Sequence, residues 1–136
     1  MITVQTKING SINKVWEFWT KPEHITKWAF ASDDWEAPEA ENDVRVGGRF
    51  KTVMSAKDKS TSFDFTGVYT SVLKNKLIEY DMDDGRHVRV EFFDLSDGVD
   101  VIETFETEKE NTEEKQREGW QAILDNFKKH VENFSN

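Results

Sequence analysis

The feature that most constrains the fold is an amphipathic segment near the C-terminal end of the chain. Its apolar residues keep to one stripe over about four turns of a helix: Trp120, Ile123, Leu124, Phe127, Val131 and Phe134. Asn111 and Glu114 can form a reciprocal cap where the segment begins. We therefore predict a long C-terminal helix whose apolar face must be covered by another layer of the protein.

The residues before this helix alternate in the way that strands do. Ile2–Ile8 places apolar side chains at alternate positions. The same pattern recurs near residues 49–56, 63–69, 78–82, 88–92 and 99–106. The acidic segment Asp33–Asp43 indicates a loop or an irregular edge strand, since it contains Pro38.

Two short helices are expected after the first strand. Ser11 is a good N-cap, and it precedes a helical stripe formed by Ile12, Val15, Trp16 and Trp19. Pro22 ends this helix and can begin a second one. Strands grouped together and followed by a long helix predict an α+β fold. We expect one helix-grip domain over residues 1–136, in which about six or seven antiparallel strands curve around the C-terminal helix.

The charge of the chain excludes several classes of partner. With 18 Lys and Arg against 27 Asp and Glu, the net charge is −9. This balance argues against nucleic acid and against an anionic membrane surface, because both need a basic patch. The N-terminus has no basic and apolar leader pattern, so we expect a cytoplasmic protein.

The apolar fraction is only 36%, yet the chain holds 10 Phe, 5 Trp and 2 Tyr.

Several motifs, in their order and spacing over essentially the whole chain, resemble one known family. They are Val15-Trp16, Pro22-Glu23, Trp28, Val46–Phe50 (VGGRF), Gly67–Tyr69 (GVY), Glu103–Glu106 (ETFE) and Gly119–Phe127 (GWQAILDNF). The chain resembles the START-like (SRPBCC) superfamily. Within it, the chain is similar to the branch related to the C-terminal domain of the activator of the ninety-kilodalton heat-shock protein ATPase.

The resemblance implies a helix-grip fold of the START-like, Bet v allergen-like kind, with a cavity between the C-terminal helix and the sheet. Members of the superfamily bind lipids, sterols or polyketides, cyclise aromatic polyketides, or act as co-chaperone modules. We expect a small hydrophobic or aromatic ligand rather than catalysis. A polyketide-cyclase-like enzyme that uses a buried carboxylate is one alternative, and a co-chaperone-like module with a chaperone partner is another. Either a monomer or a homodimer is compatible with the sequence.

Aromatic residues are the candidate ligand-binding residues. They are Trp28, Phe30, Trp35, Phe50, Phe65, Tyr80, Phe92, Trp120 and Phe127. These rings could line a cavity or fill a core, because a ring buries a large area in either setting. Gln116 continues the stripe of the long helix as a polar residue and could lie at the mouth of a pocket.

Two further residues have alternative interpretations. Glu103 lies between Val101 and Phe105 on one strand face. If that face points inward, burial would raise the pKa of this carboxyl and make it a candidate acid or base; the strand register is left open. Gly119 lies on the buried stripe of the helix, where either a strand approaches or a cavity begins, and we favour close packing.

We expect neither a metal nor a cofactor. His24, His87 and His130 lie on separate predicted elements, and the chain has no Cys. The Gly47-Gly48 pair is not a phosphate-binding loop, because it precedes a strand and lacks the following Lys and helix.

Overall fold

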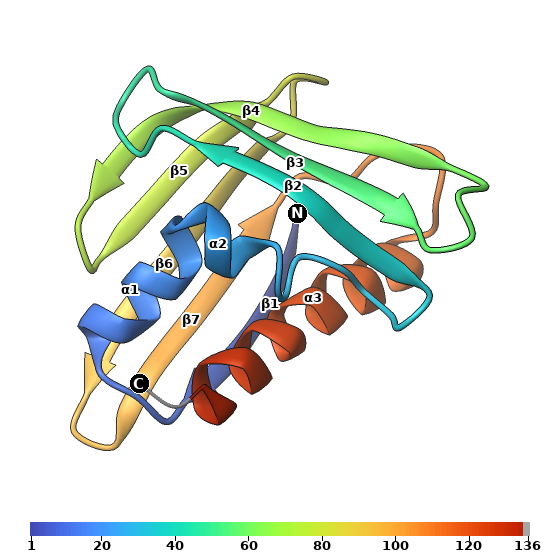
Figure 1. Ribbon diagram of the computed structural model, residues 1–136. Helices are drawn as coiled ribbons and strands as arrows, with labels where there is room; N and C mark the ends of the chain where they lie inside the picture. The colour runs from blue at the N-terminus through green and yellow to red at the C-terminus, as the bar shows by residue number, and fades with distance from the viewer. Residues whose placement is uncertain (135–136) are drawn as a thin grey trace.

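Seven antiparallel strands curve around the C-terminal helix in the computed structural model, which describes residues 1–134 (Figure 1). In chain order the elements are β1 (Ile2–Ile8), α1 (Ile12–Thr20), α2 (Pro22–Ile25), β2 (Trp35–Asn42), β3 (Arg49–Ala56), β4 (Ser62–Leu73), β5 (Leu77–Met82), β6 (His87–Leu95), β7 (Gly98–Phe105) and α3 (Glu113–Asn133). The predicted α+β helix-grip fold, with two short helices after the first strand, is confirmed.

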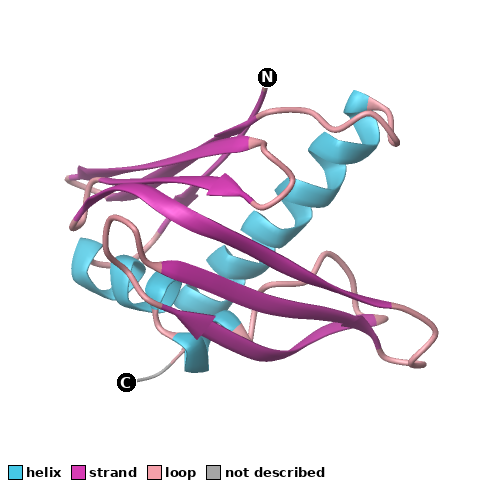
Figure 2. Cartoon of the chain, turned by 90° about the horizontal axis from the view of Figure 1, so that it is seen from above, coloured by secondary structure: helices cyan, strands magenta, loops and turns pink. Residues whose placement is uncertain are grey.

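The strand order in the sheet is β1-β7-β6-β5-β4-β3-β2. From β2 to β7, each strand therefore pairs with its neighbours in the chain, whereas β1 pairs with β7. After β1 the chain passes through α1 and α2 to reach β2 at the opposite edge. Figure 2 shows the strands from above, with α3 running obliquely behind them. The sheet thus presents one concave face to the helices.

The acidic segment forms the edge strand β2 rather than a loop. Its pairing with β3 shifts register between Glu36 and Glu39, on either side of Pro38. Proline cannot donate a backbone hydrogen bond, so an edge strand with an irregularity is where it is tolerated.

The start of α3 differs from the predicted cap. Thr112 is the N-cap, and its hydroxyl accepts a hydrogen bond from the Lys115 backbone N–H at 3.1 Å. The reciprocal cap predicted between Asn111 and Glu114 is wrong. The Asn111 N–H instead donates to the Glu108 carboxylate at 2.7 Å, so Asn111 belongs to the turn before the helix.

The short helices hold tryptophans against the core. The Ser11 hydroxyl accepts from the Lys14 N–H at 3.2 Å, which confirms the predicted N-cap of α1. Pro22 is the first residue of α2, as predicted. The indole N–H of Trp28 donates to the Phe18 carbonyl at 3.0 Å, and this bond ties the segment after α2 back to α1.

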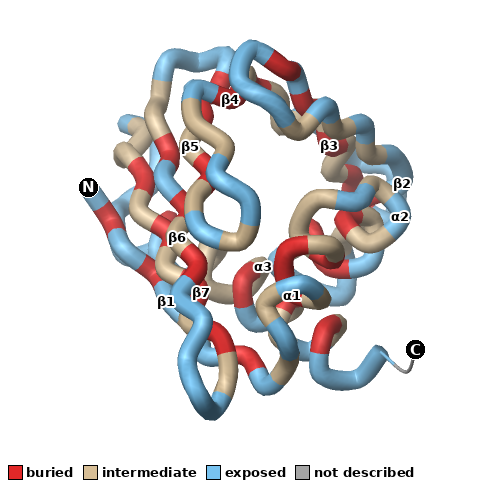
Figure 3. The backbone as a smooth tube through the Cα atoms, turned by 90° about the vertical axis from the view of Figure 1, so that its left-hand side faces the viewer, coloured by how far each residue is buried: buried red, intermediate tan, exposed pale blue. Residues whose placement is uncertain are grey.

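The centre of the core lies against the C-terminal half of α3. Leu124, Phe127 and Val131 are fully buried there. The Phe127 ring centre lies 4.9 Å from those of both Trp19 and Trp28, which are themselves 4.9 Å apart. Figure 3 shows buried residues along α3 and on the strands around it. These three rings join α1, the segment after α2, and α3 into one packed unit.

Replacing Phe127 tests this core directly. We expect Phe127→Ala to lower the free energy of unfolding by about 3–5 kcal/mol, because it removes a fully buried ring. Urea denaturation measures the change. Phe93 on β6 is 43% exposed and provides a matched control; Phe93→Ala should change the same free energy by less than about 0.5 kcal/mol. A loss at Phe127 no larger than that at Phe93 would contradict the assignment.

Two histidines join α2 to α3. The distance between His24 Nδ1 and His130 Nε2 is 2.9 Å, at which one ring donates and the other accepts. The Phe18 ring stacks on His24 with 3.8 Å between ring centres. Burial lowers the pKa of both histidines below the ordinary value, so the folded protein favours their neutral forms.

This histidine pair predicts acid sensitivity. The unfolded chain binds these protons more readily than the folded chain does. The stability that the pair contributes is therefore present above about pH 6.5 and is lost as the pH falls through the folded pKa. We expect His130→Gln to reduce the loss of unfolding free energy, relative to wild type, on going from about pH 7.5 to about pH 5.5.

His87 supplies a control of opposite sign. Its ring contacts Asp81 at 2.7 Å and Glu79 at 3.1 Å, and these carboxylates raise its pKa. The stability that His87 contributes is present at low pH and is lost as the pH rises through its folded pKa. His87→Gln should therefore enlarge the loss on acidification. If His130→Gln also enlarges it, the assignment of the histidine pair is wrong.

Candidate functional site

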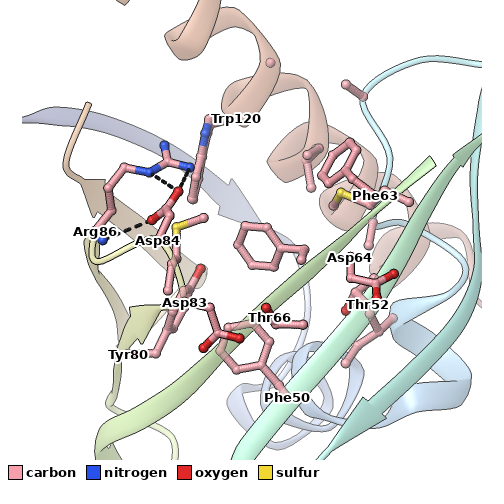
Figure 4. A pocket seen from close by; sticks show the side chains of 18 of the residues that line it. Phe50, Thr52, Phe63, Asp64, Thr66, Tyr80, Asp83, Asp84, Arg86 and Trp120 are labelled. Atoms are coloured by element: carbon pink, nitrogen blue, oxygen red, sulfur yellow. Dashed lines mark hydrogen bonds and ion pairs between the residues drawn. The ribbon is translucent and has the colours of Figure 1, made fainter. Parts of the chain in front are cut away.

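A cavity of about 960 Å³ lies between the sheet and the N-terminal half of α3 (Figure 4). The helix contributes Lys115, Gln116, Gly119, Trp120 and Ile123 to its wall. The buried residues of the C-terminal half of α3 fill the core instead. One amphipathic stripe therefore serves two purposes along its length: packing at one end and a cavity wall at the other.

Most of the predicted ligand-binding residues line this cavity. They are Trp28, Trp35, Phe50, Phe65, Tyr80, Gln116 and Trp120. The cavity wall also contains rings that were not among the predicted ligand-binding residues, namely Trp19, Phe63 and Tyr69. Tyr69 belongs to the same Gly-Val-Tyr motif as Gly67, and its inward position follows from the alternation of β4.

Three predicted residues are not part of the cavity wall. Phe127 is the centre of the core described above, and Phe92 packs edge-on against Trp16 with 5.3 Å between ring centres. Phe30 is half-buried, and its carbonyl accepts a hydrogen bond from the Asn126 side chain at 2.5 Å. Helical or strand spacing identifies the inward side of an element, but not whether another side chain or a void lies opposite.

The rings on the sheet side of the cavity form a connected cluster around Phe50. Its ring centre lies 4.8 Å from Tyr80, 5.3 Å from Tyr69 and 5.6 Å from Phe65. Gly67 makes room for this arrangement. A Cβ atom at Gly67 would lie 2.7 Å from the Phe50 ring and 2.6 Å from a backbone oxygen of β5. Any larger residue at position 67 would displace the Phe50 ring or the β5 backbone.

The helix side of the cavity is held by a ring stack and an amide. The Trp120 ring stacks on Phe105 of β7 with 4.0 Å between centres. The Gln116 side chain accepts from the Glu108 N–H at 2.9 Å and donates to the carbonyls of Glu108 and Asn111. Gln116 therefore lines the cavity while its amide fixes the turn that precedes α3.

Gly119 faces open space. A Cβ atom built at this residue has no heavy atom within 4 Å outside its own helical turn and chain neighbours. The close packing that we favoured from the sequence is therefore wrong, and the cavity is the reason for the gap. Periodicity alone could not distinguish the two, because it places Gly119 on the same stripe in either case.

Glu103 points into this interior. It pairs with Val4 of β1 and Val90 of β6, and its side chain shares the inner face of β7 with Val101 and Phe105. Only 6% of the residue is exposed. Burial raises the pKa of its carboxyl to about 8. Within residues 1–134, no hydrogen bond or ion pair joins this carboxyl to another group, although Glu103 lines the cavity.

Charged residues line the outer part of the cavity. Arg86 forms an ion pair with Asp84, marked by dashed lines in Figure 4, and Asp83 also belongs to the wall. Asp83 pairs with Arg49 of β3 at 2.7 Å, outside the wall. Hydrogen bonds from neighbouring side chains lower the pKa of both aspartates, which are therefore ionised at neutral pH.

In the described part of the chain, no group of three or more His, Cys, Asp or Glu side chains is placed to hold a metal ion. None of the helices in residues 1–134 is long and apolar enough to cross a membrane.

A curved antiparallel sheet that wraps around a C-terminal helix and encloses a cavity defines the START-like, helix-grip class of protein. Within that class, the family model described as Activator of Hsp90 ATPase homolog 1-like protein matches residues 9–132. The chain belongs to this family. Comparison with curated proteins gave no match.

Solved structures agree with this assignment. The solution NMR structure of an AHSA1-like protein from Aeromonas hydrophila is 39% identical, with 99% of each chain covered and a TM-score of 0.87. A solution structure from Cytophaga hutchinsonii is 49% identical, covers 97% of this chain and 92% of that one, and has a TM-score of 0.84. A crystal structure from Chromobacterium violaceum shares the fold at 23% identity, with 98% of each chain covered and a TM-score of 0.86.

The burial of Glu103 predicts an unusual dependence of stability on pH. The unfolded chain releases this proton near the ordinary Glu value, while the folded chain holds it until about pH 8. Stability therefore falls as the pH rises through this window. We expect Glu103→Gln to be stabilising relative to wild type, by an amount that grows by on the order of 3 kcal/mol from about pH 5 to about pH 8.

Denaturant unfolding of the two proteins at several pH values measures this difference. The exposed Glu118 of α3 provides the control, since Glu118→Gln should show no such trend. A Glu103→Gln difference that does not vary with pH would contradict the burial of a carboxyl without a partner.

Proposed function

We propose that this protein binds a small hydrophobic or aromatic molecule in the cavity between α3 and the sheet. The observation that carries the proposal is a cavity of about 960 Å³ whose wall is rich in aromatic rings. Protein interiors pack densely, with few voids larger than a water molecule. Sites for small molecules typically measure roughly 300–1,000 Å³ and combine apolar walls with a few polar groups. The size and the composition of this cavity both match such a site.

The rings of the cavity wall favour a flat apolar molecule. One wall carries the cluster around Phe50, and the opposite wall carries Trp120 stacked on Phe105. Phe65 contacts both walls, since its ring centre lies 6.2 Å from Tyr80 and 6.1 Å from Trp120. A flat ligand between these walls would gain ring contacts on both of its faces.

Binding accounts for this arrangement better than catalysis or chaperone assistance does. The enzyme alternative depends on Glu103, and within the described chain no hydrogen bond or ion pair joins a second acid–base group to this carboxyl. The family is named after an ATPase activator, but the cavity by itself favours a small molecule.

The first test is to denature the purified protein, extract it and identify any co-purified small molecule by mass spectrometry. Thermal unfolding in the presence of apolar and aromatic compounds should accompany the extraction. A ligand at about 100 times its Kd stabilises a protein by about 2.7 kcal/mol, which gives a measurable rise in Tm. If nothing is extracted and no compound raises Tm, the proposal is wrong.

Gly119 offers a pair of matched variants for this test. Because a Cβ atom meets open space there, Gly119→Ala should raise stability by up to about 1 kcal/mol through helix propensity and leave binding intact. Gly119→Trp should fold but place a large ring in the cavity, so that the Tm shift caused by a ligand falls by at least about half. A full shift in Gly119→Trp would show that the ligand binds elsewhere.

A further inference from the structure

Glu103 is not explained by an apolar ligand alone. Its side chain faces the cavity, is buried to more than nine-tenths, and has no hydrogen-bond or ion-pair partner among residues 1–134. A carboxyl in such a position is costly unless something compensates it, because an ionised form loses its hydration and a neutral form loses its hydrogen bonds. The missing partner therefore has to come from outside the chain.

The charges around the cavity favour a cation as that partner. Six acidic residues line it, against two basic ones. The acidic residues are Glu41, Asp64, Asp83, Asp84, Glu103 and Glu108, and the basic ones are Arg86 and Lys115. Asp84 pairs with Arg86 at 2.9 Å, and Asp83 and Asp64 pair with Arg49 and Lys51 outside the wall. Among residues 1–134, Glu41, Glu103 and Glu108 then remain against Lys115. An anionic ligand would thus meet an excess of like charge, whereas a cation would be attracted into the cavity.

The aromatic rings of the cavity wall also favour a cationic ligand. The face of an aromatic ring attracts a cation, and the attraction strengthens where water is excluded. The cluster around Phe50 includes Tyr80, whose phenol is close enough for the Glu103 charge to raise its pKa further, in addition to burial. Phe105 follows Glu103 on the same strand face and stacks on Trp120. Glu103 thus lies between two groups of rings.

From this arrangement we infer that the molecule bound in the cavity carries a protonated amine, which lies against the Glu103 carboxylate while its apolar body lies among the rings. This inference rests on the proposed binding function and specifies the class of ligand. An ammonium would supply both the counter-charge and the hydrogen bonds that Glu103 lacks.

Binding of the amine at neutral pH is then coupled to the release of a proton from Glu103. With a pKa of about 8, Glu103 is mostly protonated in the free protein. An ammonium against it favours the carboxylate, so that one proton passes from Glu103 to solvent as the ligand enters. The affinity for the amine should therefore increase as the pH is raised toward about pH 8, by up to about tenfold for each pH unit. Above that pH, Glu103 is already ionised in the free protein and the increase should stop.

Other groups face the same cavity and bear on this dependence. They are Tyr69 and Asp64 of β4, Tyr80 of β5, Asp83, Asp84 and Arg86 at the turn between β5 and β6, Glu41 of β2, and Glu108 and Lys115 near the start of α3. Lowered pKa values keep Asp83 and Asp84 ionised, and burial raises the pKa of both Tyr69 and Tyr80, which are therefore neutral. A substitution at Glu103 separates its contribution to the pH dependence of binding from the contributions of all the other groups.

Three probes that share one apolar body test the inference: 4-phenylbenzylamine, 4-phenylbenzyl alcohol and biphenyl-4-carboxylate. Isothermal titration calorimetry or the change in tryptophan fluorescence gives Kd for each. We expect the amine to bind at least about tenfold more tightly than the alcohol at pH about 7.5, and the carboxylate to bind most weakly. In Glu103→Gln the preference for the amine over the alcohol should disappear, whereas the control Glu118→Gln should retain it.

The outcomes separate this inference from the proposed function. If the alcohol binds in the cavity as tightly as the amine, or the carboxylate binds best, the inference is overturned and the binding function stands. A preference for the amine that persists in Glu103→Gln also overturns it. If none of the three probes binds, the result counts against the binding function itself. Amine affinity that rises from about pH 6 to about pH 8 in wild type but not in Glu103→Gln would support the inference.

Discussion

The burial of one apolar face of α3 against a curved sheet is the constraint on which the rest of the structure depends. A straight helix cannot follow a curved surface along its whole length, and here the contact is complete only over its C-terminal half, around Phe127. The N-terminal half contacts β7, where Trp120 stacks on Phe105, but the cavity separates it from the strands that carry Phe50 and Tyr80. Core and cavity are therefore two consequences of one helix against one curved sheet.

Much of the fold could be predicted from the sequence because it depends on periodicity. The alternation in Ile2–Ile8, the Ser11 cap, Pro22 and the stripe of α3 each specify local geometry, and together they leave the helix-grip arrangement as the consistent solution. The N-cap residue of α3 was harder to predict. Asn111 and Thr112 are both good caps, and the choice between them depends on the Glu108 carboxylate, which holds the Asn111 N–H.

The site could be predicted only in part, because periodicity identifies the inner side of an element but not what lies opposite. Phe127 and Trp120 belong to one stripe and have similar chemistry, yet one fills the core and the other borders the cavity. The same limit explains Gly119, which is compatible with either a close strand or a void. For Glu103 the missing information was the register of β7, since a shift of one residue would have turned its side chain to the outer face.

The pairing of β1 with β7 has a consequence for how the chain reaches this structure. Ile2 lies opposite Phe105, whereas the other neighbouring strands in the sheet follow one another along the chain. During synthesis the first strand emerges early, but its partner emerges about a hundred residues later, and α3 later still. The apolar face that carries Ile2, Val4 and Ile8 therefore cannot be buried until β7 and α3 have been synthesised. Closing so long a loop costs more entropy than closing the short loops between the other paired strands, so we expect the docking of β1 to be a late step in folding.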